Sequence, residues 1–316
     1  MSIVEELARQ HSLNIADLRR FCEFAPHRYK IYTIPKRSVG HRVIAHPSKK
    51  LKEFQRSLND ILLKTLPVHE RVYSYRKNKS IRNNAFEHLE SSYLLKMDFK
   101  DYFMSITPQL FWEKVNPLNI IENSDEKKII ERLLFWCPSK RLSGKLVLSV
   151  GAPTSPLISN FIAFDFDKEI NRLCRESGIT YTRYSDDLTF TTFHKSTLFS
   201  IPKLVSSLLK ETMSGSVSIN ESKTVYASKA SNRHVTGITL TSDGRLSVGR
   251  DRKRYISSLI HKFSQGSLPR DEFSHAQGLF TFATFIEPDF RKRMEYKYTE
   301  NTISNFLNNG GDPNGK

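Results

Sequence analysis

The spacing of apolar and polar residues changes along the chain and predicts a mixture of helices and strands. In residues 1–26 apolar positions recur every three or four residues, as on one face of an amphipathic helix, and Asn14 is a suitable N-cap for a second helix. In residues 29–46 apolar and basic residues alternate, which predicts a two-stranded hairpin that turns near Gly40. Helical spacing returns in the basic segment 49–66. The N-terminal part therefore predicts helices beside one hairpin.

The middle of the chain predicts buried strands separated by helices. The apolar segment 92–99 predicts a strand, and Thr107 with Pro108 forms an N-cap and first position for the helix that follows. Residues 151–176 begin as a Gly/Pro loop and continue as a long helix. Aromatic and β-branched residues on both sides of the centre of 181–191 then predict a hairpin.

The C-terminal part predicts short strands followed by a basic helix. Beyond Val235 the pattern favours short strands around Gly244, and the segment 250–263 is basic with helical spacing. Its apolar residues share one face: Ile256, Leu259, Ile260 and Phe263. The tail from about residue 308 is rich in Gly and Asn and is expected to be disordered.

Composition indicates a polyanionic partner and argues against several other classes of protein. The chain has 316 residues, with 49 Lys and Arg against 33 Asp and Glu, a net charge of +16 and a pI near 9.7. Such an excess, clustered as it is here, favours nucleic acid. No apolar run approaches a transmembrane helix, and the N-terminus lacks a signal peptide's apolar stretch. Cys22, Cys137 and Cys174 form neither a CxxC pair nor a disulfide framework. We expect a cytoplasmic protein without a zinc site or a membrane partner.

Three aspartates stand out because they adjoin predicted strands in a basic chain. Asp186 and Asp187 lie at the expected hairpin turn, and Asp98 follows an apolar strand earlier in the chain. An isolated pair of aspartates is typically a solvated turn. Carboxylates that converge from separate strands are instead what Mg²⁺ needs, since it takes oxygen ligands from protein, water and substrate phosphates. Two such ions about 3.5–4 Å apart support phosphoryl transfer.

Five segments, in this order, resemble the motifs of reverse transcriptases. LLKMDFKDYF is similar to the first palm motif, and YSDD to the YxDD box; the others are GAPTSPLISN between them and SINESKT and RHVTGITL after them. Two further motifs resemble those of retron reverse transcriptases. They are NAxxH, with Asn84 and His88, and VTG, formed by Val235, Thr236 and Gly237.

The resemblance implies an α+β right-hand polymerase. An N-terminal helical segment would occupy 1–28, fingers and a palm with an antiparallel sheet 29–240, and a helical thumb 241–316. The implied reaction is RNA-directed DNA synthesis from deoxynucleoside triphosphates on part of a cognate structured non-coding RNA. Relatives prime from an internal guanosine 2′-OH and leave branched RNA–DNA (msDNA). The resemblance also implies a role in antiphage defence, with a retron effector or toxin protein as a partner.

At the reacting centre the resemblance assigns catalytic, metal-binding roles to Asp98, Asp186 and Asp187, with two Mg²⁺ ions as the cofactor. Asp101 is a poorer metal candidate because it does not match the motif aspartate.

Around the nucleotide, the resemblance implies that Phe103 is the aromatic gate against a ribose 2′-OH, although core packing is the alternative. Lys223 matches the lysine that protonates the leaving pyrophosphate, with a solvated lysine as the alternative. Arg42 and Gly151 are expected to contact the nucleotide. Val150 stands where many relatives carry Gln, which places one such contact in doubt.

RNA contacts are expected from the two retron motifs and from the thumb. Asn84 and His88 offer hydrogen bonds and stacking, and the VTG triplet, Val235 to Gly237, allows close backbone approach at Thr236 and Gly237. The thumb cations are expected to meet backbone phosphates without reading bases: Arg250, Arg252, Lys253 and Arg254.

Two other interpretations fit parts of the sequence. One is another small reverse transcriptase, of a group II intron or a diversity-generating element, but NAxxH favours the retron type. The other is a non-catalytic RNA-binding scaffold, which the presence of all three carboxylates disfavours.

Overall fold

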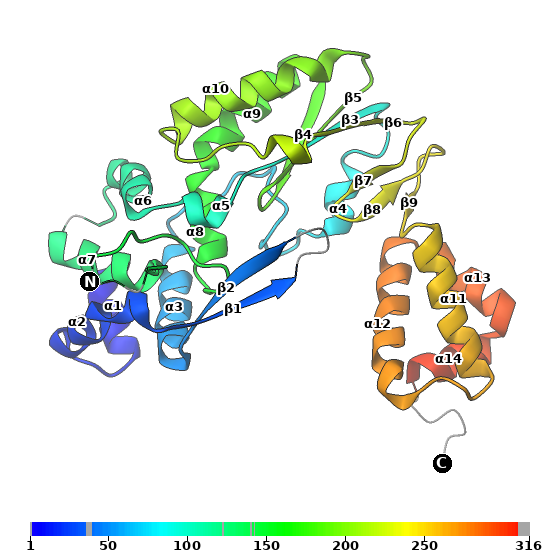
Figure 1. Cartoon of the computed structure of the whole chain (residues 1–316), viewed down its shortest axis with the longest axis horizontal. Coiled ribbons are helices and arrows are strands. Elements are labelled where there is room, and N and C mark those ends of the chain that lie inside the picture. Colours follow the sequence, from blue (N-terminus) through cyan, green and yellow to red (C-terminus); the bar gives the residue numbers. More distant parts are fainter. Residues whose placement is uncertain (1, 36–39, 122, 140, 142, 309–316) are drawn as a thin grey trace. The chain divides into compact units, whose positions relative to one another are not determined.

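The structure is a computed structural model that describes residues 2–35, 40–121, 123–139, 141 and 143–308 (Figure 1). The chain forms two compact units, and each unit is built from two separate stretches of the sequence. The first comprises residues 1–79 and 95–225, and the second 80–94 and 226–316. The second unit therefore begins before residue 240, the boundary that the sequence predicts between palm and thumb, and takes in a short segment from much earlier in the chain.

The first unit begins with a layer of packed helices. These are α1 (Ile3–Gln10), α2 (Ile15–Glu23), α3 (Lys49–Leu62) and α7 (Ser124–Leu134), and α1 contacts the other three. Asn14 Oδ1 accepts a hydrogen bond from the Asp17 N–H at 2.8 Å, which confirms the predicted N-cap. A 3₁₀ turn, η1 (Ala25–His27), leads from α2 to the first strand.

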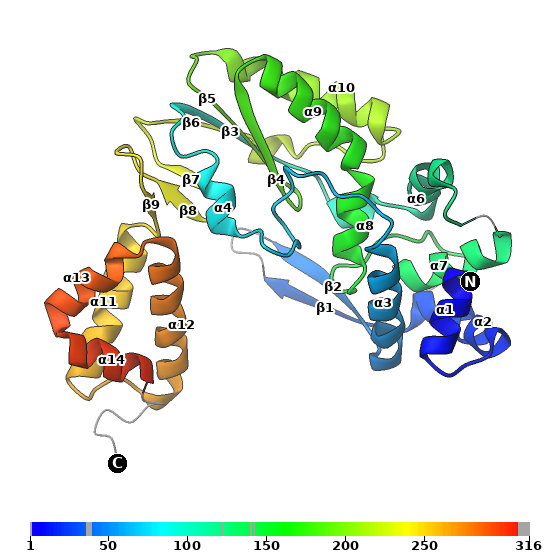
Figure 2. The same ribbon diagram turned by 180° about the vertical axis from the view of Figure 1, so that it is seen from behind.

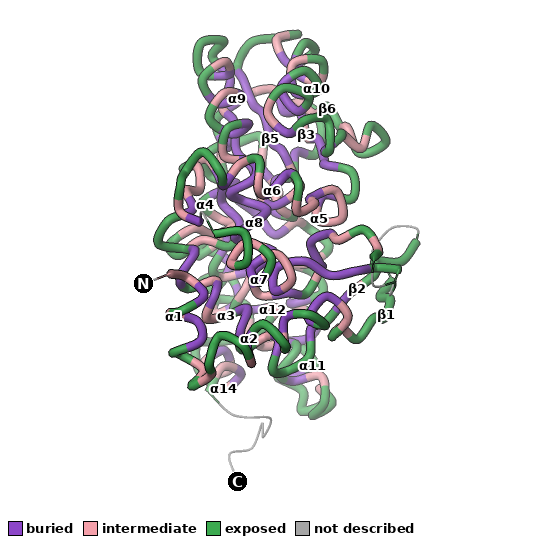
Figure 3. Tube along the Cα trace, turned by 90° about the vertical axis from the view of Figure 1, so that its left-hand side faces the viewer, coloured by how far each residue is buried: buried purple, intermediate pink, exposed green. Residues whose placement is uncertain are grey.

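A two-stranded antiparallel hairpin follows, as the alternating pattern predicts. Strands β1 (Tyr29–Pro35) and β2 (His41–Pro47) pair from Tyr29 opposite Pro47 to Pro35 opposite His41. β1 is exposed along nearly all of its length (Figure 3). Gly40 has a φ of +99°, in the left-handed region that glycine adopts without strain. Residues 36–39 of the predicted turn lie outside the described residues.

A four-stranded sheet carries the aspartates. Its order is β4–β5–β3–β6, with β3 (Tyr93–Asp98), β4 (Ile179–Tyr184), β5 (Asp187–Thr192) and β6 (Val225–Ser228). β4 and β5 form an antiparallel hairpin, and helix α9 packs against β4 while α10 packs against α9 (Figure 2). The boundaries of the two units at 94/95 and 225/226 fall within β3 and β6.

Short helices connect these strands. They are α5 (Tyr102–Ser105), α6 (Pro108–Val115), α8 (Ser155–Ile162), α9 (Phe164–Glu176) and α10 (Ile201–Thr212), with 3₁₀ turns η2 (Asn116–Leu118), η3 (Thr197–Ser200) and η4 (Glu221–Lys223). Thr107 caps α6, as predicted. The single long helix expected in 151–176 is divided, because the backbone leaves helical geometry at Ala163.

The second unit joins a small sheet to a helical bundle. α4 (Ile81–Phe86) packs against the antiparallel strands β7 (Arg233–Val235) and β8 (Ile238–Leu240), beside which lies β9 (Leu246–Ser247). The bundle contains α11 (Arg250–Ser264), α12 (Arg270–Ile286), α13 (Asp289–Tyr298) and α14 (Glu300–Asn308).

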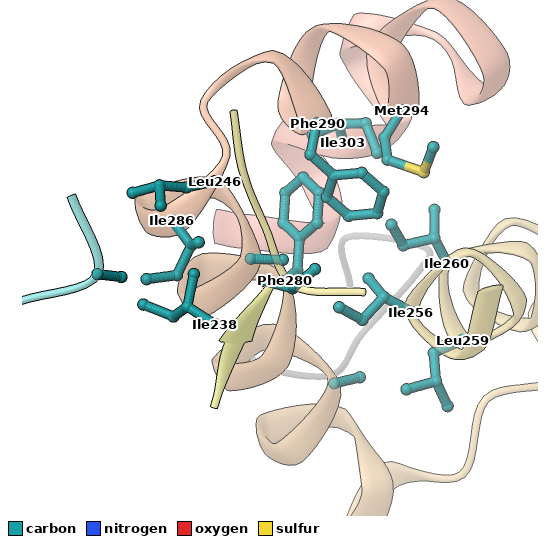
Figure 4. Close-up of a cluster of buried hydrophobic side chains, with 14 of the residues drawn as sticks. Ile238, Leu246, Ile256, Leu259, Ile260, Phe280, Ile286, Phe290, Met294 and Ile303 are labelled. Atoms are coloured by element: carbon teal, nitrogen blue, oxygen red, sulfur yellow. The ribbon is translucent and has the colours of Figure 1, made fainter. Parts of the chain in front are cut away.

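One hydrophobic cluster holds the second unit together. Ile238 and Leu246 of the small sheet meet Ile256, Phe280 and other bundle residues in it (Figure 4). The apolar face that the sequence predicts for 250–263 is buried in this cluster, which confirms it. The predicted disordered tail beyond Asn308 lies outside the described residues.

Two features of composition can be compared with the structure. The three cysteines are buried free thiols, in agreement with the absence of a predicted disulfide framework. Among the described residues, no helix is long and apolar enough to cross a bilayer.

Candidate active site

The first unit brings the three predicted aspartates to one place. Asp98 is the last residue of β3, and Asp187 is the first of β5. Tyr184 pairs with Asp187, so Ser185 and Asp186 form the two-residue turn between β4 and β5. The backbone N–H of Phe99 donates to the Asp186 carbonyl at 2.9 Å, which ties this turn to the end of β3. The predicted convergence of carboxylates from separate strands is therefore present.

The negative charges of neighbouring carboxylates raise the pKa values of Asp186 and Asp187. Burial, and then the negative charge of Asp98, raise the pKa of Asp186. Burial, and then the charge of Asp186, raise the pKa of Asp187 to about 6. A carboxylate whose pKa is raised by neighbouring acids lies in an excess of negative charge, which a bound cation would relieve.

Lys223 supplies one positive charge to this group. Its Nζ donates to both Asp98 oxygens, at 2.9 Å each. Partial burial lowers the pKa of Lys223, but the hydrogen bond to Asp98 and the charges of the three aspartates outweigh it and raise the pKa overall. The side chain is more than half exposed. Lys223 is therefore a charged donor at the carboxylates.

The donor set fits Mg²⁺ better than a metal that requires a complete protein cage. In the described parts of the chain, no cluster of three or more His, Cys, Asp or Glu side chains is arranged to hold an ion. Mg²⁺ asks for less, because one or two carboxylates suffice when water and substrate phosphates supply the rest. Carboxylate oxygens meet that requirement, and the raised pKa values of Asp186 and Asp187 show that negative charge is concentrated there.

A buried network holds the turn from behind, and the sequence analysis missed it. Arg183 and Asp167 are both fully buried and form two hydrogen bonds, Nε to Oδ1 at 2.8 Å and Nη2 to Oδ2 at 2.6 Å. Arg183 Nη1 also donates to the Ser185 carbonyl at 2.9 Å, and the Tyr181 hydroxyl donates to Asp167 at 2.7 Å. Asp167, between apolar residues of a helix, and Arg183, in a buried strand, are the signals that could have revealed it.

The turn needs this support because its geometry is strained. Ser185 is 6% exposed with a φ of +59°, a conformation in which few residues other than Gly and Asn are comfortable. Its N–H donates to Ser74 Oγ at 2.8 Å. Two-residue hairpins demand positive φ in the turn. The network thus fixes the backbone from which Asp186 projects.

The predicted nucleotide residues all lie in the first unit. Arg42 is exposed on β2, close enough that its charge lowers the pKa of Asp186, although burial raises it more. Phe103 is half-buried on α5, and its ring meets the Tyr102 ring edge-on at a centroid distance of 5.9 Å.

Gly151 is held close to the β2 strand. It has a φ of +125°, and a Cβ at this position would lie 3.1 Å from the Ala45 carbonyl oxygen. The adjacent Val150 carbonyl accepts from the Ala45 N–H at 3.1 Å. A side chain at Gly151 would therefore disturb the loop's attachment to the hairpin.

The two retron motifs meet in the second unit, but their side chains are placed differently from expectation. Thr236 Oγ1 donates to the Ile81 carbonyl at 3.3 Å, so VTG lies beside the helix that carries NAxxH. His88 is fully buried and Asn84 is 1% exposed. Neither side chain is exposed in this structure, so direct contact of Asn84 and His88 with RNA stays a prediction. Val235 is also buried, whereas Gly237 is exposed.

Three of the four predicted thumb cations line one basic groove. Arg250, Lys253 and Arg254 of α11 face Arg293 and Lys297 of α13 across a pocket of about 670 Å³. Such a groove suits a phosphate backbone.

The fourth cation, Arg252, lies outside the groove. Its guanidinium stacks over the Phe282 ring at 5.5 Å. The run of cations along one helix does not separate these two faces in the sequence, because charge alone does not report orientation.

Comparison with known proteins identifies the family. Residues 34–240 match the family described as reverse transcriptase (RNA-dependent DNA polymerase). The chain is thus an RNA-directed DNA polymerase. The retron Ec83 reverse transcriptase of Escherichia coli is 44% identical, over 87% of this chain and 88% of that protein. The retron Ec73 reverse transcriptase of the same species is 30% identical over the same shares. The chain belongs to the retron reverse transcriptases.

Solved structures give more distant likenesses. Telomerase from Candida albicans with a fragment of telomeric RNA aligns with a TM-score of 0.48 and 13% identity, over 90% of this chain and 61% of that one. A foamy viral protease–reverse transcriptase with double-stranded DNA aligns with a TM-score of 0.45 and 17% identity, over 89% and 44%.

Proposed function

We propose that this enzyme reverse transcribes part of a cognate structured non-coding RNA, beginning at an internal guanosine 2′-OH and leaving branched RNA–DNA. The observation that carries the proposal is 44% identity to a retron reverse transcriptase across most of both chains, with all three carboxylates in place. The proposal includes a role in antiphage defence together with an effector or toxin protein.

Asp98, Asp186 and Asp187 would hold two Mg²⁺ ions. When bound, such ions activate an attacking hydroxyl and stabilise the leaving oxygen. Lys223 stands at Asp98 as a charged donor and is suited to protonate the departing pyrophosphate. Arg42, whose charge reaches Asp186, is suited to meet the triphosphate. Phe103, half-buried beside the end of β3, is suited to exclude a ribose 2′-OH.

The two retron motifs would act on RNA through the surface that they build. Helix α4, which carries Asn84, contacts the strands β7 and β8 that flank the Thr236–Gly237 turn, and Thr236 and Gly237 have φ values of +48° and +80°. The exposed Gly237 backbone can approach RNA closely because it has no side chain. Gly237 is therefore the proposed contact, with Asn84 and His88 as its support.

Sequencing of nucleic acid that copurifies with the expressed protein tests the proposal. We expect one RNA covalently joined to DNA, which separates after treatment with a 2′–5′ debranching enzyme. A linear product on that RNA, or no preference for the RNA encoded beside the gene, would favour another class of small reverse transcriptase.

A second measurement tests the motif surface. Gly237→Val should reduce synthesis on the cognate RNA while retaining extension of an annealed DNA primer on a generic RNA template. A parallel fall in both activities at one salt concentration would contradict a role in RNA recognition. Plaque assays with and without the gene test the defence role.

A further inference from the structure

A basic pocket in the first unit lies apart from the carboxylate site. It has a volume of about 680 Å³ and is formed where η1, the base of the β1–β2 hairpin and the start of α3 come together. Five cations line it against one carboxylate, Glu53: Arg28, Lys30, Lys49, Lys52 and Arg56. The pocket shares no lining residue with the aspartates or Lys223.

These cations are not neutralised within the described residues. None of the five forms an ion pair there, although carboxylates pair with arginines elsewhere on the same unit, as Asp125 does with Arg19. Lys52 Nζ instead bonds to His46 Nε2, and the Arg28 guanidinium lies over the Phe21 ring at 4.7 Å. His27 Nδ1, in the pocket wall, is buried without a hydrogen-bond partner. The lining therefore has unused donor capacity and concentrated positive charge.

The N-terminus of α3 adds to the positive electrostatic potential of the pocket. Ser48 occupies the N-cap, but its side chain makes no capping hydrogen bond, and the first turn contains no acid. Lys49 and Lys50 stand there instead, beside N–H groups that have no helical partner. Cations are unfavourable at the positive end of a helix, whereas an anion there is stabilised. Helix α1, by contrast, begins with a complete capping box from Ser2 and Glu5.

We propose that this pocket binds backbone phosphates of RNA at a place separate from the reacting centre. The five cations and the one carboxylate leave a net positive charge of four, so the pocket can meet more than one phosphodiester. None of the three rings in the lining is both exposed and free of a partner. Tyr29 is partly buried and accepts a hydrogen bond from Gln55 at 2.9 Å, His27 is half-buried, and the exposed His46 is bonded to Lys52 Nζ. The contact is therefore to the backbone and independent of sequence. It rests on the family's use of RNA templates, not on the priming mechanism proposed above.

Salt dependence of RNA binding tests the inference. The triple variant Lys49→Gln/Lys52→Gln/Arg56→Gln is compared with Lys168→Gln/Lys203→Gln/Lys210→Gln, which removes the same charge from exposed positions on α9 and α10. Binding of a fluorescein-labelled RNA stem-loop is measured between 50 and 200 mM KCl. Each lost phosphate contact lowers the slope of log K against log salt by about 0.9. Loss of two contacts makes the affinity change over this range about tenfold smaller in the pocket variant.

Stability, catalysis and binding are measured separately. The pocket variant should keep its melting temperature, because none of the three cations forms an ion pair within the described residues, and should extend a saturating annealed primer–template at the wild-type rate. Equal salt slopes for the pocket and control variants would overturn the inference. A raised KM for dATP with an unchanged RNA slope would identify a nucleotide site and overturn it as well. Absence of branched product in the wild type would affect only the proposed priming mechanism.

Discussion

Replacement of Asp167 by Asn should destabilise the first unit strongly, although the two side chains have nearly the same shape. The change leaves the Arg183 guanidinium fully buried without its counter-charge. Breaking a buried ion pair by removing one partner costs about 3–5 kcal/mol. The same helix provides a matched control in Asp165, whose ion pair with Lys114 at 2.6 Å is half exposed on the carboxylate side. Asp165→Asn should cost less than about 1 kcal/mol.

The assay can be confined to the relevant unit. Both tryptophans of the chain, Trp112 and Trp136, lie in the first unit, so their fluorescence during urea titration follows its unfolding. With a slope of roughly 2–3 kcal/mol per molar urea, the Asp167→Asn midpoint should fall by about 1–2 M. An Asp167→Asn midpoint within experimental error of Asp165→Asn would refute the energetic role assigned to the buried pair.

A double variant separates stability from positioning. Asp167→Leu/Arg183→Met removes both charges, and apolar replacement of a buried pair is often neutral for stability. DNA synthesis should nevertheless remain slow, because the Ser185 carbonyl loses the donor that holds the turn. Full activity of a stable double variant would show that the turn positions Asp186 without Arg183.

Further predictions concern the reacting centre. Asp187→Asn should lower DNA synthesis by several orders of magnitude while RNA binding and folding remain, and near-normal primer extension would contradict its assignment to the metals. Because the pKa of Asp187 is raised to about 6, the free enzyme should lose activity as pH falls through about 6, where this carboxylate takes up a proton; a flat single-turnover profile between pH 5 and 7.5 would argue otherwise. Folding also raises this pKa above its unfolded value, so the Asp187 contribution to stability should decline as pH rises from about 4 to 6, and urea titrations in EDTA should show that decline reduced in Asp187→Asn. Phe103→Ala should raise ribonucleotide incorporation relative to deoxynucleotide, and unchanged sugar discrimination in an active variant would make Phe103 a packing residue.

The sequence predicts the position of the aspartates because the relevant signals are local. Asp98 ends an apolar strand, and Asp186 stands in a turn between two β-favouring runs, so each pattern by itself places a carboxylate at a strand end. The resemblance to a family implied that the three aspartates share one site, whereas the position of β5 beside β3 is known only from the structure. The bidentate contact of Lys223 with Asp98 could not be anticipated, because it depends on the path of the chain after Asn220, whose N–H donates to the Asp98 carbonyl at 2.7 Å.

Burial of polar groups is the feature that the sequence indicates least. Asn84 and His88 are polar residues of types that often contact RNA, and nothing in their neighbourhood in sequence indicates that both are buried. The burial of Arg183 and Asp167 could not be predicted for the same reason. Each is stabilised in the interior by a partner 16 residues away in the sequence. Residue type alone predicts that polar side chains are exposed. Whether one of them is buried depends on a partner that only the three-dimensional structure reveals.

The two-part origin of the second unit has a consequence for synthesis on the ribosome. Ala85 and Leu89 belong to the same hydrophobic cluster as Phe280 and Ile303. At roughly 5–20 residues per second, about ten seconds or more pass between the emergence of the first pair and that of the second. During that interval residues 80–94 cannot pack against the helical bundle, which has not yet been synthesised. In a nascent chain that pauses after residue 240, the apolar side chains of this segment would therefore be exposed to chaperones.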